Sequence, residues 1–306
     1  MTTQSLQEIE ASIVAILDEK GPRLGKELAL DIRVPSLRLW QACYTSPQLF
    51  TSHFASYYLR YDITRADLIR LSPSILRDFL SFTLFSLPEQ RDQLIERQGA
   101  LSNLHREISL DKLGIAQQAV NNLLLQIPRE LHPSVCMFVA GDLAYHLAHN
   151  EPREHTATGE MIRGSDIDIV VLHDGLPDDV LAMIDGEMRA MKNFYLRHPD
   201  YRHELDYIVK TKAKMIKQMR YQDIHDKIAS KVCYESVFLG GSLDLYITIR
   251  NALKTSGVVQ LIEMDFEKAL LNRKNVMKRL LEYDGDEPDA ETRSLFFFSQ
   301  ERVEFT

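Results

Sequence analysis

The feature that most constrains the fold is a short alternating segment from Arg163 to Leu172, in which one apolar residue separates two aspartates. Asp166 and Asp168 alternate with Ile167 and Ile169, the period of a β-strand with one buried face. Because side chains at i and i+2 of a strand point to the same face, we expect the two carboxylates to lie side by side. The segment therefore predicts a strand that presents a pair of carboxylates, with the isoleucines packed behind them.

Two carboxylates held this close repel each other, and the repulsion raises one pKa or destabilises the strand. A divalent cation removes the repulsion, since Mg²⁺ takes oxygen ligands, commonly one or two carboxylates together with the phosphates of a nucleotide. Metal ions at such a site stabilise both the attacking and the leaving oxygen of a phosphoryl transfer. We therefore expect Asp166 and Asp168 to hold Mg²⁺ or Mn²⁺. The alternative is a strand with a solvated acidic face.

Length and composition indicate an ordinary globular protein. The chain has 306 residues, of which 45% are hydrophobic and 26% charged, and this length suits two domains with buried cores. The net charge of -8 argues against non-specific binding of nucleic acid by the whole chain and still permits a local basic patch. Cys43, Cys136 and Cys233 lack ligand spacing and are expected to be buried thiols in a reducing compartment. With neither a basic, apolar leader nor a run of about 18 apolar residues, the sequence predicts a cytoplasmic protein without a membrane partner.

The first 65 residues have the pattern of three helices followed by a strand. Helices are expected over 5–20 and 24–32 and from Ser36, as the capping residue, to about Tyr44, with the strand within 50–61. This outline resembles a winged-helix domain, a likeness of pattern that carries no specific motif. The resemblance implies that the helix from Ser36 is a recognition helix.

A local excess of positive charge accompanies this pattern. From Lys20 to Arg65 there are seven basic residues against three acidic ones, a net of +4, which permits contacts to phosphates. Arg33 and Arg38 are the candidate nucleic-acid contacts, with Arg38 on the supposed recognition helix. The alternative is a small helical packing module that dimerises or braces the other domain.

Residues 66–132 are expected to form a helical connecting region. Its four helices are predicted over 67–71, 75–87, 90–104 and 111–125. Pro88 interrupts the pattern, and the prolines at 128 and 133 mark the expected boundary with the second half.

A second apolar run, Val135 to Ala140, has the length of a buried strand and precedes Gly141-Asp142 and a helix expected over 143–148. A strand, a glycine turn, a helix and an Asp-x-Asp strand, in this order, resemble the nucleotidyltransferase superfamily. That family includes polymerase beta, the aminoglycoside nucleotidyltransferases and the nucleotidyltransferase toxins of abortive-infection systems. Its first strand ends in Gly-Gly or Gly-Ser, whereas this chain has Asp142 at the second position.

The resemblance implies a binding pocket for the triphosphate. Gly141 would let the backbone approach the phosphates closely, and Asp142, Gly164 and Ser165 would shape the pocket with it. A polar insertion over 150–162 separates the glycine turn from the Asp-x-Asp strand.

The resemblance also implies a third carboxylate on a later strand. A helix is expected over 176–195 and a strand over 203–209, where Asp206 matches the third position and Glu204 is the fallback ligand. In the family this carboxylate acts as general base towards the acceptor hydroxyl and helps to hold a metal.

Beyond residue 210 the chain is basic and helical, and it looks like the abortive-infection branch of the family. The likeness carries over to Lys227, which would neutralise phosphates, with Lys231 as a second candidate; the alternative for each is a solvated surface lysine. Gly240-Gly241-Ser242 is interpreted as a helix C-cap and turn. A helix is expected over 258–283, and 294–298 as a last strand or docking segment.

The sequence thus predicts an α/β (α+β) protein: a helical, winged-helix-like half followed by a nucleotidyltransferase-like mixed sheet flanked by helices. The predicted regions are 1–65, 66–132, 133–255 and 256–306. The resemblance implies metal-dependent transfer of a nucleoside monophosphate from a nucleoside triphosphate, ATP among the candidates, to RNA, protein or a small molecule. One alternative is a nucleic-acid-binding regulator whose nucleotidyltransferase-like half senses a nucleotide without transferring it, a reading that Asp142 favours. Another is an assembly protein with neither activity.

Overall fold

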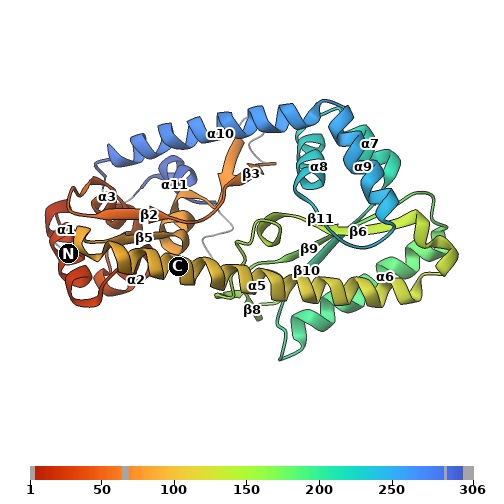
Figure 1. Ribbon diagram of the computed structural model, residues 1–306, viewed down its shortest axis with the longest axis horizontal. Helices are drawn as coiled ribbons and strands as arrows, with labels where there is room; N and C mark the ends of the chain where they lie inside the picture. Colours follow the sequence, from red (N-terminus) through yellow and green to blue (C-terminus); the bar gives the residue numbers. More distant parts are fainter. Residues whose placement is uncertain (1–3, 64–68, 286–287, 299–306) are drawn as a thin grey trace. The chain divides into compact units, whose positions relative to one another are not determined.

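The structure is a computed structural model, which describes residues 4–63, 69–285 and 288–298 (Figure 1). The fold is mixed α and β, as predicted. It divides into two compact units, one from Met1–Tyr58, Arg70–Leu104 and Lys268–Thr306, the other from Leu59–Ile69 and His105–Glu267. Each unit is therefore built from segments that lie far apart in the sequence. The four regions predicted from the sequence are contiguous ranges, which these units do not test, so that division stays a prediction.

The first unit contains small helices and a three-stranded antiparallel sheet. Its N-terminal helices are α1 (Leu6–Lys20), α2 (Gly25–Ile32) and α3 (Ser36–Thr45). The strand order is β1 (Arg23–Leu24), β5 (Thr83–Ser86) and β2 (Phe50–His53), with β5 in the centre. A capping box in which Ser5 and Glu8 exchange hydrogen bonds begins α1. The three predicted helices are confirmed, although Pro35, not Ser36, stands at the cap position of α3.

Between residues 66 and 90 the structure differs from the two helices predicted over 67–71 and 75–87. Residues 67 and 68 lie outside the described residues, and β4 (Ile69–Ser72) pairs with β3 (Tyr58–Tyr61) in a two-stranded sheet. The helix expected over 75–87 is only α4 (Ile75–Arg77) and a π-helical turn before β5 begins. Leu84 and Phe85 are both fully buried. A central strand that is buried on both faces has no alternation to distinguish it from a helix.

The long helix α5 (Arg91–Gln126) replaces two predicted helices, so the expected interruption between 104 and 111 is also wrong. No glycine or proline occurs between Leu104 and Asp111, and nothing there ends a helix. The helix contributes residues to both compact units.

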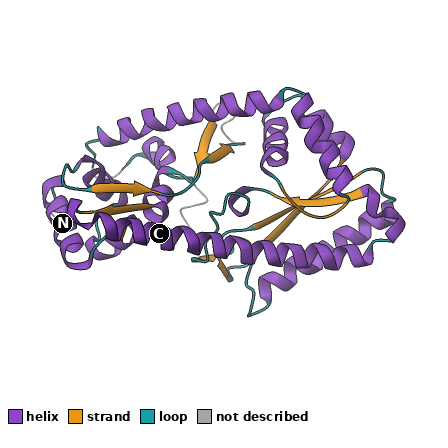
Figure 2. Ribbon diagram, in the orientation of Figure 1, coloured by secondary structure: helices purple, strands orange, loops and turns teal. Residues whose placement is uncertain are grey.

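The second unit is organised on a four-stranded mixed sheet (Figure 2). The strands lie in the order β10 (Leu205–Thr211), β9 (Ile167–His173), β6 (Val135–Val139) and β11 (Val237–Gly241). β9 and β10 are parallel, whereas β6 is antiparallel to both of its neighbours. Apolar residues of α5 and α6 (Asp178–Arg197) pack with the sheet in one core. The remaining helices are α7 (Lys212–Gln218), α8 (Ile224–Glu235), α9 (Leu243–Thr255), α10 (Val258–Leu281), which continues into the first unit, and α11 (Ala290–Phe296) of the first unit.

The glycine turn after β6 is not followed by the helix expected over 143–148. A 3₁₀ turn, Gly141–Leu143, leads into further turns, and the Leu147 amide donates to the carbonyl of Asp142 (2.9 Å) instead of propagating a helix. The polar insertion is a hairpin of β7 (Pro152–Glu154) and β8 (Met161–Arg163).

Two further predictions are corrected. Gly240 and Gly241 belong to the end of β11 and are not a helix C-cap. Gly241 has φ of 86° and a Cβ there would overlap the carbonyl of Val135, so glycine is required by the close approach of β11 to β6. The segment over 294–298, expected as a last strand or docking segment, is not a strand, because it begins inside α11. Its Phe296 is buried against Trp40, which agrees with the docking alternative.

Cys43, Cys136 and Cys233 are free and buried, as predicted. None of the described helices combines the length and the apolar composition that a membrane crossing requires.

Candidate functional site

Two of the three predicted catalytic aspartates are direct neighbours in the sheet. Asp168 of β9 is the register partner of Asp206 in the parallel strand β10. Register partners on parallel strands project to the same face, and neighbouring strands are about 5 Å apart. The carboxylates therefore come together near the beginnings of the two strands.

The surroundings of Asp168 disfavour its ionised form. Burial by surrounding protein raises its pKa to about 6, and the charges of Asp206, Glu204 and Asp142 add to the rise, while Lys231 opposes it. The residue nevertheless keeps exposed surface. It makes no ion pair or hydrogen bond with the part of the chain that the structure describes. Asp168 is thus an accessible carboxylate whose ionised form lacks a counter-charge in direct contact.

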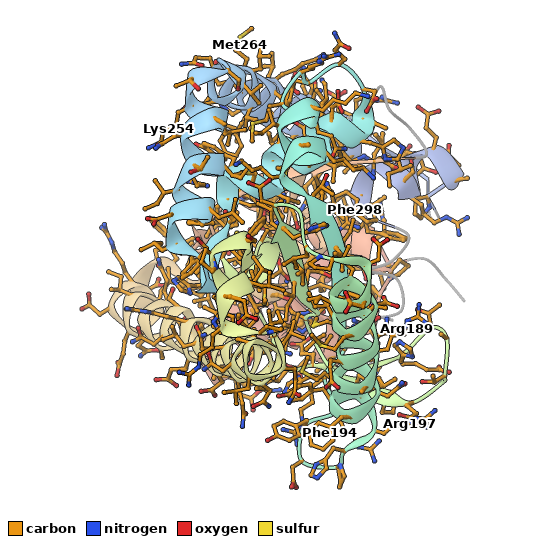
Figure 3. The ribbon with its side chains drawn as sticks, turned by 90° about the vertical axis from the view of Figure 1, so that its right-hand side faces the viewer. Arg189, Phe194, Arg197, Lys254, Met264 and Phe298 are labelled. Atoms are coloured by element: carbon orange, nitrogen blue, oxygen red, sulfur yellow. The ribbon has the colours of Figure 1, made fainter. Side chains whose placement is uncertain are left out.

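Asp206 is paired with a lysine from α6. Lys192 makes an ion pair with the Asp206 carboxylate, and both side chains are partly exposed. Arg189, Phe194 and Arg197 project from the outside of the same helix (Figure 3).

Asp166 lies immediately before β9, and an arginine of the inserted hairpin neutralises it. Arg153, only 9% exposed, makes an ion pair with Asp166 and a second one with Glu204, at 2.7 Å from Nη2 to Oε2. Its Nε also donates to the carbonyl of Gly164 (3.0 Å). His155 Nε2 lies 3.4 Å from the other oxygen of Glu204. The inserted hairpin thus supplies counter-charge to the strand entrances.

The glycine turn is occupied by the chain's own carboxylates. The Gly141 amide donates to Oε1 of Glu235 (3.0 Å), and Lys231 pairs with the same carboxylate at 2.6 Å. Burial raises the pKa of Glu235, while Lys231 lowers it. On the other side of the turn, Ser165 Oγ donates to Oδ2 of Asp142 (3.2 Å). The predicted phosphate-pocket residues Gly141, Asp142 and Ser165 are therefore close to one another, with Glu235 among them.

The two predicted lysines lie in different surroundings. Lys231 is near enough to lower the pKa of Asp168. Lys227 instead donates to Asp265 (3.0 Å), and its ammonium is 5.0 Å from the centre of the Tyr221 ring. The Tyr61 ring lies 5.8 Å from the same ammonium, so the partners of Lys227 are an acid and two aromatic rings, none of which is a predicted site residue.

Sequence reasoning missed the cations and one acid that complete this arrangement: Lys112, Arg153, Lys192 and Glu235. Arg153, Lys192 and Glu235 come from a hairpin and two helices with no local motif. Lys112 had a signal, since His105, Ser109 and Lys112 recur at i, i+4 and i+7, which places three polar side chains along one stripe of α5.

The residues at the sheet fit a magnesium ion that is completed by a substrate. Within residues 4–63, 69–285 and 288–298, no three His, Cys, Asp or Glu side chains form a group that could hold a metal. Mg²⁺ does not require such a cage, since it is commonly bound by one or two carboxylates, water and substrate phosphates. Asp168 and Asp206 would supply this minimal oxygen donor set, with Lys192 as a competitor for Asp206.

The predicted nucleic-acid surface of the first unit is largely covered. Six residues of α3 are buried, namely Leu37 and the five residues from Leu39 to Cys43. Gln41 Nε2 donates to the carbonyls of Leu280 (2.8 Å) and Tyr283 (2.7 Å), at the end of α10. Arg38 contacts Gln41 (3.3 Å), whereas Arg33 is an exposed residue at the end of α2. Arg65, which contributed to the predicted positive excess, lies outside the described residues.

Comparison of the chain with models of protein families, with curated proteins and with solved structures gives no match.

Proposed function

We propose that the second unit is a metal-dependent nucleotidyltransferase that moves a nucleoside monophosphate from a nucleoside triphosphate to an acceptor. The observation that carries this proposal is the register pairing of Asp168 with Asp206, which puts two carboxylates on one face of the sheet. The raised pKa of Asp168 adds to it, because a site that penalises its own negative charge gains the most from a bound cation.

The proposed fold of this unit is nucleotidyltransferase-like. Support comes from a glycine turn after β6 and from carboxylates at the starts of β9 and β10. The missing helix after the glycine turn departs from the family pattern.

In the proposed reaction, an acceptor hydroxyl oxygen forms a bond to the α-phosphorus of the triphosphate. The bond from that phosphorus to the bridging oxygen of pyrophosphate breaks, and pyrophosphate leaves. Asp168 and Asp206 would hold Mg²⁺ or Mn²⁺, which supplies charge neutralisation to the phosphates. Asp206 also accepts the hydroxyl proton, and Lys231 lies near Asp168, where it attracts the triphosphate. Positioning and charge account for most of the catalysis in such a reaction.

A second candidate is a nucleotide sensor that binds without transfer. The pairing of Glu235 with the Gly141 amide favours it, because a carboxylate there competes with a phosphate. We also propose that the first unit is winged-helix-like, on the basis of its helices and its strand order β1-β5-β2. Since α3 is mostly buried, we infer a packing role for this unit ahead of a nucleic-acid-reading one.

Calorimetric titration with ATP, GTP, CTP and UTP, with and without Mg²⁺, tests the proposal. Asp168→Asn is the site variant, and Asp174→Asn is the matched control, since Asp174 is an exposed aspartate just beyond the other end of β9 that pairs with Lys212 (2.7 Å). Metal-dependent binding that is lost in Asp168→Asn and kept in Asp174→Asn supports the site. Transfer of label from the α-phosphate to an acceptor then supports the enzyme, and binding with no transfer supports the sensor. A folded protein that binds none of the four overturns both.

A further inference from the structure

One face of α5 carries a polar stripe that contacts the backbone around the carboxylate site. His105 Nδ1 lies 2.9 Å from the carbonyl of Ala148, and Ser109 Oγ accepts from the Ala148 amide (3.1 Å). Ala148 lies in the loop after the turns that follow Gly141–Leu143. Lys112, one turn further along the helix, reaches the entrances of β9 and β10. The stripe formed by His105, Ser109 and Lys112 therefore contacts the three segments that carry the predicted carboxylates and the predicted phosphate pocket.

Lys112 is the most deeply placed member of this stripe. It is 1% exposed, and its ammonium donates to the carbonyls of Arg163 and Ser165, each at 2.8 Å, and to Nδ1 of His203 at 3.0 Å. An ammonium has three protons, so the three bonds use all of its donors. Because Nδ1 of His203 accepts, the neutral ring carries its proton on Nε2. Burial and the neighbouring positive charges lower the pKa of His203 to about 4, which keeps the ring neutral.

The three acceptors belong to the two strands that carry the carboxylates. Arg163 and Ser165 precede β9, whereas His203 precedes β10. Direct hydrogen bonds also join the two entrances, from the Arg163 amide to the Arg202 carbonyl (2.7 Å) and from the Ile167 amide to the Glu204 carbonyl (2.9 Å). One side chain on a third element thus contacts both chain segments, with Ser165 three residues before Asp168 and His203 three residues before Asp206.

An ammonium in this position is expensive to bury. Burying a charge is unfavourable unless its interactions are nearly complete, and the three hydrogen bonds of Lys112 go to two carbonyls and an imidazole, none of which carries a negative charge. Burial lowers its pKa to about 7. Its neighbours along α5 include Ala116, Ala119 and Val120, all buried and apolar, so an apolar residue would be cheaper at this position. What a lysine provides and an apolar residue does not is a fixed connection to the two strand entrances.

We propose that Lys112 is a positioning residue that sets the separation of Asp168 and Asp206 and thereby the affinity of the site for a divalent cation. The affinity part rests on the proposed function, whereas the positioning part does not. Partners outside the direct ligands of a metal site commonly change metal affinity by about 10 to 100-fold when they are lost.

The test compares Lys112→Met with the wild-type protein and with Val120→Ala. Val120 lies on the same helix, is 0% exposed and belongs to the core of the second unit, but it makes no hydrogen bond to the strand entrances. Val120→Ala therefore reports what a loss of core packing on α5 does by itself. Mn²⁺ affinity is measured by electron paramagnetic resonance, and amide hydrogen exchange is followed over 163–167 and 203–206. We expect Lys112→Met to weaken Mn²⁺ binding by about tenfold or more and to speed exchange in both segments. Val120→Ala leaves Mn²⁺ binding and exchange in these segments near the wild-type values.

Each outcome decides one part. If Lys112→Met binds Mn²⁺ as tightly as the wild-type protein and its amide exchange is unchanged, Lys112 has no positioning role. The positioning role is also overturned if Val120→Ala loses as much Mn²⁺ affinity as Lys112→Met does. If the wild-type protein binds Mn²⁺ neither alone nor together with ATP, the proposed metal site fails, and the exchange data alone decide whether Lys112 fixes the two entrances. Should Lys112→Met not fold, His203→Ala removes one of the three acceptors and is expected to change the same segments to a smaller extent.

Discussion

Asp168 lies directly beside Asp206 in the sheet, although 38 residues separate them along the chain. Asp166, the nearer neighbour in sequence, makes its ion pair with Arg153 instead. Asp206 likewise pairs with Lys192, so of these three aspartates Asp168 is the one without a cation in direct contact among the described residues. The site in this form carries an unbalanced negative charge at one defined place.

This imbalance predicts how stability depends on pH in the absence of metal. The pKa of Asp168 is raised from 3.8 to about 6 in the folded protein, so the folded state binds the proton more tightly than the unfolded state. Ionisation of Asp168 therefore costs stability as pH rises from about 4 to about 6, and the full cost is present above that range. We expect Asp168→Asn to have the higher melting temperature at pH 8 in EDTA and to lose this advantage at pH 4.

Thermal unfolding across this pH range checks the prediction, with Asp174→Asn as the control that should show no such trend. Saturating Mg²⁺ should stabilise the wild-type protein and not Asp168→Asn, because ligand that binds only the folded state adds to its stability. If the difference in melting temperature between Asp168→Asn and the wild-type protein stays constant from pH 4 to pH 8, the pKa of this carboxylate is not raised by burial.

Local sequence patterns predicted the elements whose cause is local. The helix α1 has its capping box and apolar residues at helical spacing, and the strand β9 has its alternating start. β5 was misread because it is a central strand, buried on both faces by residues from other segments. The role of Gly241 was misinterpreted because glycine is required there by the close approach of the Val135 carbonyl, which is more than a hundred residues away in the sequence.

The same distinction applies to the site. The carboxylates were predictable because motif and strand period place them, and their counter-charges were not. Arg153 comes from an inserted hairpin and Lys192 from a partly exposed position of α6, and a basic residue is ordinary at such positions. Lys112 was detectable in principle, since a polar stripe on the buried side of a helix is unusual.

The packing of Phe296 against Trp40 of α3 predicts how much this ring stabilises the first unit. Phe296 is 2% exposed and packs edge-on against Trp40, with ring centres 5.8 Å apart. Phe296→Ala removes a buried aromatic ring and leaves a cavity, which should lower the free energy of unfolding by about 3 kcal/mol. Phe50→Ala, at a residue that is 46% exposed in the same unit, should cost under about 1 kcal/mol. Urea denaturation of the two variants measures both values, and equal losses would show that Phe296 is not part of the core.

The buried acid of the first unit predicts a larger loss. Asp78 accepts from Tyr57 (2.8 Å) and from Arg273 Nη2 (2.6 Å), and His53 Nε2 is 2.6 Å from its other oxygen. Burial alone would raise the pKa of Asp78, but His53, Arg273 and Tyr57 together hold it below 3.8. Asp78→Asn leaves a buried guanidinium without its carboxylate, a change that costs about 3 to 5 kcal/mol.

Denaturation at neutral pH tests this value, and Asp174→Asn should cost no more than about 1 kcal/mol because its ion pair is exposed. Since the pKa of Asp78 is lowered, its contribution is present above pH 3.8 and is lost as pH falls through the folded value. The gap between wild-type protein and Asp78→Asn should therefore narrow in acid. A gap that persists unchanged in strong acid would assign the effect to packing alone.

The turn before β9 gives the sharpest test of how backbone geometry supports the carboxylates. Gly164 has φ of 50°, and a Cβ at this position would overlap the carbonyl oxygen of His149. Gly257 also has a positive φ, of 78°, but no atom lies within 4 Å of where its Cβ would be. Gly257→Ala should therefore cost only the left-handed conformation, about 1 to 2 kcal/mol. Gly164→Ala should cost clearly more, because the backbone of His149 cannot rotate away as a side chain would.

If the two variants are equally stable, the close approach of the turn to His149 is not a constraint on the fold. If Gly164→Ala is the less stable one and also binds Mn²⁺ more weakly than Gly257→Ala, the turn positions the strand that carries Asp168.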